Sequence, residues 1–309
     1  MLRYTLIRLV QAPIVLFLLV TITFFLIRFA PGGPFSGEKN LPPEVEAALE
    51  AKYQLDKPLP VQYFRFMGRL LHGDLGPSLK HKDRTVNEII GSHLPTSMLL
   101  GGIAMSLALA MGLGAGIVAA LRQNTAVDYS VMTVAVLGIS LPTFVIGPLL
   151  QIFLAMRTQI FPVAQYHGLS SPSYLVLPAV TLALPFAARI ARLMRAGMLD
   201  VLGQDFVRTA RAKGLHEHTV VLRHALRGGI LPVISYLGPA IAAITTGSLV
   251  VEKIFQIPGL GSEFVESALN RDYFLVIGTV IVYGLFIVLC NLIADLAYGI
   301  LDPRVSYHD

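Results

Sequence analysis

The residues whose types and spacing could do chemistry are concentrated in one basic stretch, residues 189–230, which we call the basic arm. An arm of about 40 residues between two apolar runs is long for a simple connection. It therefore predicts contact with another protein. The alternative is a positive loop that only fixes the orientation of the chain in a membrane. The arm carries Arg189, Arg192, Arg195, Arg208, Arg211, Lys213, Arg223 and Arg227 against Asp200, Asp205 and Glu217.

The apolar part of the chain offers little other chemistry. Arg28 ends the first apolar run, and Asn291 and Asp295 lie near the end of the last one. A proton-driven carrier needs carboxylates nearer the middle of the bilayer, and an intramembrane protease needs a catalytic set inside its spans. Neither is present, and the only cysteine, Cys290, has no metal-ligand companions. We expect no catalytic residue, no metal site and no cofactor in this chain.

The phosphate-binding pattern G-x-x-x-x-G-K-[ST] does not occur, so we expect no ATP to bind by that route. If transport is active, its energy must come from a partner. The net charge of +5 follows from the basic arm. Membrane orientation explains it better than nucleic-acid binding does.

The elements that position the basic arm are apolar runs of spanning length. The chain is 54% hydrophobic and 14% charged, whereas a soluble domain carries about 25% charged residues. We predict an all-α polytopic membrane protein with six transmembrane helices and the basic arm between the fourth and the fifth. The predicted spans are residues 9–27, 97–121, 129–156, 173–189, 230–251 and 274–294.

The charges of the short connections predict the orientation. Lys and Arg residues are enriched in cytoplasmic loops. Arg3, Arg8, Arg122, the basic arm and Arg304 would all face the cytoplasm, against Arg157, Lys253 and Arg271 outside. We therefore expect both termini in the cytoplasm.

We divide the chain into three parts. Residues 1–30 form the cytoplasmic N-terminus and the first span, and residues 31–97 form a long extracytoplasmic segment that lies partly along the membrane surface. Residues 98–309 form a core with five spans and the arm. Gly112 and Gly116 form a small-x-x-x-small pair that lets two helices approach closely.

Prolines predict irregular helices in two spans. Pro142 and Pro148 indicate that the third span is kinked. Pro178 and Pro185 indicate that the fourth is short and broken.

The arm contains RTARAKGL followed by LRHALRGGILPV, and GSLVVEKIFQIPGLG, ALNRDY and the ending LDPR come after it. These motifs resemble a known family, the membrane-spanning subunits of bacterial ATP-binding-cassette importers, in the dipeptide, oligopeptide and nickel permease branch. In the first third of the chain, RFAPGGPF, LPPEVEAALEAKY, HGDLGPS and LRQNT are similar to the B-type subunit of oligopeptide permeases. The resemblance covers essentially the whole chain.

The resemblance implies a multi-pass subunit of the bacterial inner membrane that imports oligopeptides or dipeptides by alternating access. Its partners would be a second, homologous permease subunit, two cytoplasmic ATPases that bind ATP and Mg, and an extracytoplasmic peptide-binding protein. Other cargoes of the branch, glutathione or a nickel chelate, stay open. So do two other classes, a self-sufficient secondary carrier and a non-transporting scaffold or receptor.

The resemblance also implies the docking element of the arm. The broad importer pattern Glu-Ala-Ala-x-x-x-Gly is kept only at Ala210 and Gly214, and its glutamate is lost. We expect Gly214 to supply a backbone geometry or a close approach that a side chain would prevent. Its alternative role is only to stop a helix. The candidate ATPase-coupling residues are Arg208, Ala210, Arg211, Lys213, Gly214 and Leu215.

Two further sets of candidates lie near the fifth span. The segment after that span should fold back at the outer mouth, because its proline and glycines cannot continue a helix. It would form a gate, contact the binding protein or be a plain surface turn. Hydroxyls at the end of the span would line the passage or hydrogen-bond between helices. The candidates are Phe255, Ile257, Pro258, Gly259 and Gly261 in the loop, and Thr245, Thr246 and Ser248 in the span.

Overall fold

The computed structural model describes residues 2–30, 32–35, 42–167 and 171–301. Within these residues the chain is helical and contains no β-strand, which confirms the all-α prediction. The elements are α1 (Leu2–Phe29), α2 (Pro43–Tyr53), α3 (Leu59–Leu71), α4 (Val86–Leu121), α5 (Ala126–Ser140), α6 (Thr143–Leu150), the π-helix η1 (Gln151–Arg157), α7 (Ser173–Leu202), α8 (Asp205–Ala212), α9 (Glu217–Thr219), the π-helix η3 (Val220–Ala225), α10 (Leu226–Gly229), α11 (Leu231–Thr245), α12 (Leu249–Ile254), α13 (Leu260–Leu269) and α14 (Tyr273–Leu301).

The apolar helices confirm a polytopic membrane protein. Within the described ranges, five helices are long and apolar enough to cross a membrane, and one bent pair makes a sixth candidate. The five are Val10–Phe29, Val86–Leu121, Ser173–Leu202, Leu231–Ile254 and Tyr273–Ala294, and the bent pair is Ala126–Ser140 with Thr143–Arg157.

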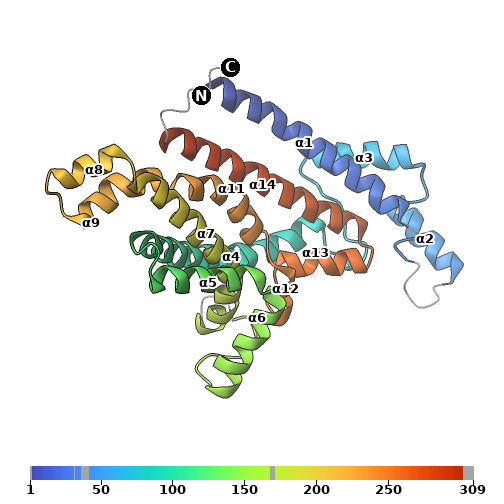
Figure 1. Cartoon of the computed structure of the whole chain (residues 1–309). Coiled ribbons are helices and arrows are strands. Elements are labelled where there is room, and N and C mark those ends of the chain that lie inside the picture. Colours follow the sequence, from blue (N-terminus) through green and yellow to red (C-terminus); the bar gives the residue numbers. More distant parts are fainter. Residues whose placement is uncertain (1, 31, 36–41, 168–170, 302–309) are drawn as a thin grey trace.

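The third predicted span, residues 129–156, is wrong as a single kinked helix. α5 ends at Ser140, and α6 with η1 leaves it at 107°. Pro142 has no N–H to donate, and Leu141 before it is extended (φ −80°, ψ 123°), so the helix cannot continue here. Pro148 lies inside α6. α6 lies beside α7 and α12, and the segment of α6 and η1 points down from the bundle in Figure 1.

The fourth span is longer than predicted and is not broken. α7 runs without interruption from Ser173 to Leu202, with Pro178 and Pro185 inside it. Prolines within membrane helices are tolerated where the surroundings satisfy the freed backbone groups. The basic arm therefore begins inside a spanning helix, and its first three arginines belong to α7.

α4 also extends beyond the predicted second span. It starts at Val86 with a capping box, in which the Thr85 hydroxyl accepts from the Glu88 N–H (3.2 Å) and the Glu88 carboxylate accepts from the Thr85 N–H (3.2 Å). The helix then continues through Pro95. The boundary that we placed between residues 97 and 98 falls inside this helix, and the three-part division of the chain stays a prediction.

Small residues bring α4 and α7 together, and these two helices form the most extensive helix pair among the described residues. A Cβ atom built on Gly112 would lie 2.7 Å from the Ala187 carbonyl oxygen, and one on Gly116 would lie 2.6 Å from the Ala191 carbonyl oxygen. Real Cβ contacts are not this short. The predicted small-x-x-x-small pair is thus the contact between the two helices.

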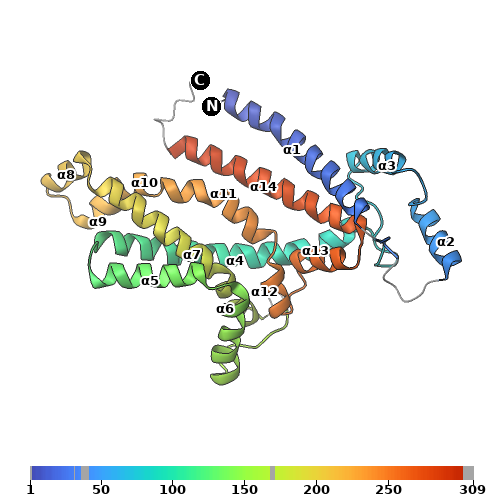
Figure 2. The same cartoon turned by 45° about the vertical axis from the view of Figure 1, so that its right-hand side comes forward.

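The bundle has two distinct ends. α8 and α9 protrude at one end, which we call the arm end (Figure 1). α2, α3 and α13 lie at the opposite end, which we call the far end (Figure 2). In both views α1 begins and α14 finishes toward the arm end. The two ends of the described chain therefore lie on the same side of the bundle, as an even number of spans requires.

Substituting Gly116 by alanine tests the α4–α7 contact. We expect Gly116→Ala to destabilise the bundle by about 1–3 kcal/mol, because overpacking forces a backbone shift. Thermal unfolding in detergent measures the change. Gly114→Ala is the matched control, since its new Cβ meets no heavy atom within 4 Å. Equal stability of the two variants would contradict this account of the contact.

Candidate functional site

The inner part of the basic arm is anchored by a buried ion pair. Arg195 on α7 donates from Nε to Asp128 Oδ1 (2.6 Å) and from Nη2 to Oδ2 (2.7 Å). Asp128 is 1% exposed and also accepts from the Asn124 N–H (3.0 Å). A bidentate arginine–carboxylate pair fixes orientation as well as distance. It therefore ties α7 to the start of α5 at the arm end.

The outer part of the basic arm is a folded helical hairpin. α8 runs outward and the chain returns through α9 and η3. Apolar side chains from both halves are buried against one another. The hairpin is therefore a structured extension of α7 whose buried side chains continue the main apolar core of the bundle; they are Val207, Ala210, Val220, Val221 and Ala225.

Gly214 forms the turn of this hairpin. Its backbone is left-handed (φ +75°), and its N–H donates to the Arg211 carbonyl (2.9 Å) just after α8 ends. A Cβ atom at this position would meet nothing within 4 Å. We expected a glycine here either for its backbone geometry or for a close approach. The structure supports the backbone geometry and shows no close approach within this chain.

An ion pair closes the hairpin across the turn. Arg211 donates from Nη2 to Glu217 Oε1 (2.7 Å) and from Nε to Oε2 (3.1 Å). These hydrogen bonds lower the pKa of Glu217 and raise that of Arg211. The pKa of the Glu217 carboxyl is lower in the folded than in the unfolded protein, so the ion pair stabilises the hairpin at pH values above the unfolded-state pKa. This stabilisation is lost as the pH falls through the folded-state pKa. Both side chains are exposed, so the contribution is small.

The tip of the hairpin presents a basic and apolar surface. Arg208, Lys213 and Leu215 are exposed, whereas Ala210 is only 5% exposed and is one of the buried side chains of the hairpin. Any part that Ala210 has in coupling therefore acts through the shape of the hairpin. Away from the tip, Phe206 at the start of α8 and Leu222 in η3 are apolar but nearly half exposed. Exposed apolar side chains among cations are typical of a surface that contacts a protein.

The predicted outer loop folds back at the far end, between α12 and α13. Phe255 and Ile257 are buried, at 1% and 2% exposed, while Pro258 is exposed. Gly259 and Gly261 are also buried. The structure thus brings these candidates together in one packed turn in which the two large apolar side chains point inward.

The loop is built around a buried carboxylate that sequence reasoning missed. Glu252 is 0% exposed. Its carboxylate accepts hydrogen bonds from the Ser97 hydroxyl (2.8 Å) and from the Ser262 N–H (2.8 Å). Ser97 in turn accepts from the Leu260 N–H (2.8 Å), so one serine of α4 holds both α12 and the start of α13. A Cβ atom on Gly259 would lie 2.3 Å from a Glu252 carboxylate oxygen. The sequence signal that could have identified this buried carboxylate is the set of glycines that follows Glu252.

A second set of buried acids links the far end to the segment before α4. Glu263 is 6% exposed, and its carboxylate oxygens lie 3.0 Å from His81 Nε2 and 3.6 Å from His93 Nε2. Asp272 is 1% exposed and accepts from the Leu79 N–H (3.1 Å) and the Ser78 hydroxyl. These polar contacts fasten the segment to α13 and α14.

The three hydroxyl candidates are engaged locally. Thr245 donates to the Ile241 carbonyl (2.6 Å) and Thr246 to the Ala242 carbonyl (2.8 Å). Ser248 caps α12 by accepting from the Val251 N–H (3.4 Å). Gly247 between them is left-handed (φ +101°), so α11 and α12 are separate helices. A passage-lining role for these hydroxyls stays a prediction.

A bundle of apolar spans that extends one helix into a structured basic hairpin has the layout of a membrane transport subunit. Known protein families and curated relatives agree with this interpretation. A family model described as a binding-protein-dependent transport system inner membrane component matches residues 112–307, and a model for the N-terminal part of such components matches residues 1–100. The chain belongs to this family. It is accordingly a multi-pass protein of the inner membrane.

Curated relatives match along the whole chain. The oligopeptide transport system permease protein OppB of Escherichia coli K12 is 47% identical over 307 residues, covering 99% of this chain and 100% of the relative. OppB of Haemophilus influenzae is 46% identical with the same coverage. The dipeptide transport system permease protein DppB of Bacillus subtilis is 42% identical over 308 residues, covering 100% of this chain and 99% of the relative.

Gly259→Ala tests the packing around Glu252. The new methyl group must displace a buried carboxylate or leave its hydrogen-bonding partners unsatisfied, so we expect a loss of about 1–3 kcal/mol. The midpoint of thermal unfolding reports the loss. Gly91→Ala, at the same end of the bundle and with no atom within 4 Å of its new Cβ, is the control. An unchanged midpoint for Gly259→Ala would contradict the described geometry.

Proposed function

We propose that this chain is a permease subunit of an importer for oligopeptides or dipeptides, driven by partner ATPases that dock on the basic arm. The observation that carries the proposal is the hairpin at the tip of α7. It is folded, exposed at its basic and apolar tip, and continuous with a spanning helix. A loop that only fixed topology would need no such buried apolar packing.

The cargo follows from the relatives. The curated proteins that match the whole chain at 42–47% identity are named as oligopeptide and dipeptide permeases. We propose the same class of cargo here. A second homologous permease subunit would complete the passage, and an extracytoplasmic binding protein would deliver the peptide at the far end. ATP and Mg would be bound by the ATPases.

The contacts of α7 support a mechanical role in alternating access. Docking at the hairpin tip moves Leu215 and its neighbours, and the buried apolar side chains of the hairpin pass that movement to α7. The Arg195–Asp128 pair and the glycine contacts with α4 make α7, α5 and α4 move together. Closure of the ATPases would thereby rock part of the bundle and exchange outward for inward access.

At the far end we propose that the α12–α13 turn meets the binding protein. Pro258 and Gln256 are exposed there, while Phe255 and Ile257 anchor the turn from inside. The turn would therefore act as a firm contact surface. The hydroxyls of Thr245 and Ser248, which are partly exposed, would line the passage when the bundle opens.

Gly214→Val tests the proposed coupling. A β-branched residue at φ +75° costs about 1–3 kcal/mol of backbone strain and distorts the hairpin tip. We expect peptide uptake into vesicles to fall at least about tenfold while the complex still assembles in the membrane and hydrolyses ATP. A radiolabelled peptide measures uptake, and phosphate release measures hydrolysis.

The matched control is Gly203→Val at the other end of α8. Gly203 is right-handed (φ −82°), and its new Cβ would meet no atom within 4 Å. We expect this control to transport peptide normally. Normal uptake by well-expressed Gly214→Val would overturn the assignment of the hairpin tip as the coupling element.

A further inference from the structure

Two of the spanning helices, α7 and α11, differ from the others in what they expose. Both lie wholly within the described ranges, and neither has a large apolar side chain among its exposed residues. By contrast, α1, α4, α5, α6 and α14 each expose at least two, such as Phe17 on α1 and Phe144 on α6. Lipid-facing helices expose apolar side chains, because only these are favourable in hydrocarbon. The exposed surface of α7 and α11 is therefore unsuited to lipid.

The exposed residues of α7 and α11 are small, polar or charged and form one stripe on each helix. On α7, beyond Ser173 at its first position, they recur three or four residues apart, which places them on one face. The exposed residues of α11 recur four residues apart in the same way. We call these two stripes the α7–α11 face. It includes Arg189, Arg192 and Ala196 on α7, and Ser235, Pro239 and Ala243 on α11.

One contact joins the two stripes. The Arg189 guanidinium carbon lies 5.8 Å from the centre of the Tyr236 ring on α11. Arg189 lies below the arm end, because it precedes Arg195 by six residues, about 9 Å along the helix. Gly112, well inside α4, packs beside Ile190 at the same level. The stacking therefore holds a cation at membrane depth instead of leaving it to extend to the surface.

Arg189 has no anionic partner in the described part of the chain. Arg195 pairs with Asp128, whereas no described carboxylate pairs with Arg189. Asp200, the acid on the same stripe, lies eleven residues away, about 16 Å along α7. Stacking uses the face of the guanidinium group and leaves its N–H donors available. An unpaired cation at membrane depth indicates a path for a charged or polar ligand.

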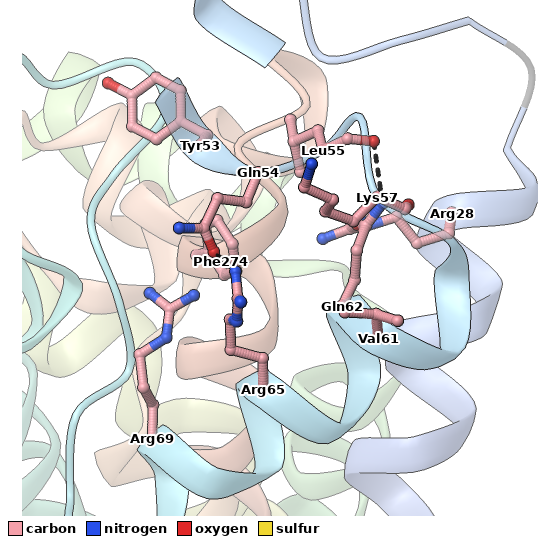
Figure 3. A pocket seen from close by; sticks show the side chains of 10 residues that line it. All are labelled: Arg28, Tyr53, Gln54, Leu55, Lys57, Val61, Gln62, Arg65, Arg69 and Phe274. Carbon is pink, nitrogen blue, oxygen red and sulfur yellow. Dashed lines mark hydrogen bonds between the residues drawn. The ribbon is translucent and has the colours of Figure 1, made fainter. Parts of the chain in front are cut away.

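The arginines of the far end are in a different situation. Arg65 and Arg69 extend from α3 toward Gln54 and Phe274 (Figure 3). Arg65 donates to the Gln54 amide oxygen, and the Arg69 guanidinium carbon lies 5.7 Å from the centre of the Phe274 ring. The cavity left among them measures only about 10 Å³, no more than one water molecule needs. These arginines pack the chain against itself and leave no room for a ligand.

We propose that the α7–α11 face is one wall of the peptide passage and that Arg189 in this wall binds the terminal carboxylate of the peptide. This inference rests on the proposed function, since the peptide is the anion that the passage would carry. The donors of a guanidinium group match the two oxygens of a carboxylate. The small exposed residues of α11 leave space along that helix for the peptide backbone. The second permease subunit would supply the opposite wall.

Cysteine labelling measures whether the α7–α11 face contacts water. Ser235→Cys is made in a chain whose native cysteine is removed by Cys290→Ser, and a charged thiol reagent is added to both sides of the full complex in proteoliposomes. The matched control is Ile14→Cys on α1. Ile14 is 53% exposed, and each position lies four residues inside the arm-end start of its span, Val10 or Leu231. Thiols react as thiolates, which form in water, so we expect Ser235→Cys to react at least about tenfold faster.

Two labelling results would contradict a water-lined wall. Equal rates at the two positions would mean that Ser235 has no more contact with water than an apolar helix surface. An unreactive Ser235→Cys in a complex that transports peptide would mean that another subunit covers the α7–α11 face.

A pair of peptides tests Arg189 itself. The two peptides share one sequence, end in a free carboxylate or in an amide, and are chosen so that the binding protein binds both. We expect Arg189→Gln to lower uptake of the acid at least about tenfold and to leave uptake of the amide unchanged. Arg189→Lys, which keeps the charge, should retain most of the acid uptake. The matched control, Arg122→Gln, removes an exposed cation from the α4–α5 connection and should transport both peptides normally.

Either of two uptake results would overturn the role of Arg189. Normal uptake of the acid by Arg189→Gln would show that the peptide carboxylate binds elsewhere. An equal loss for acid and amide would assign Arg189 to packing or to an ion pair with another subunit. If the wild-type complex imported neither peptide, the proposed function itself would fail, so the two failures are distinguishable.

Discussion

The close approach of α4 and α7 is the contact on which the rest of the structure depends. In a bilayer no hydrophobic force drives one apolar helix against another, so association depends on close packing. Gly112 and Gly116 provide this close packing, because backbone carbonyls of α7 occupy the space that side chains at these two positions would need. Packed against α4, α7 continues as one helix through two prolines. It emerges as the support of the hairpin that forms the tip of the basic arm.

The two ends of the bundle are then stabilised by different interactions. At the arm end, the Arg195–Asp128 pair fixes α7 to α5, and the buried apolar side chains of the hairpin join the main core of the bundle. At the far end, the buried Glu252 gathers α4, α12 and α13 through Ser97 and backbone N–H groups. A movement imposed on the hairpin therefore reaches a bundle whose helices are firmly joined at both ends. Rigid joints of this kind suit rocking of whole helices better than local loop motion.

Local signals in the sequence predicted much of this arrangement. The apolar runs located five of the spans, the small-residue pair predicted a close helix contact without naming its partner, and Gly214 was expected at the turn of the docking element. The sequence could not predict which prolines interrupt a helix. Pro142 ends a helix, whereas Pro178 and Pro185 lie inside one, and the difference depends on what packs beside each proline. Glu252 was missed because its partner Ser97 lies 155 residues away in the sequence.

The most direct test of the account is photocrosslinking from the hairpin tip. A photoreactive amino acid replaces Leu215 in the full complex, in native membranes, and the same substitution at the exposed Leu269 of the far end is the control. The account predicts an adduct between position 215 and a cytoplasmic ATPase subunit, and none between position 269 and that subunit. An ATPase adduct from position 269, or none from position 215 in an assembled, transporting complex, would contradict it.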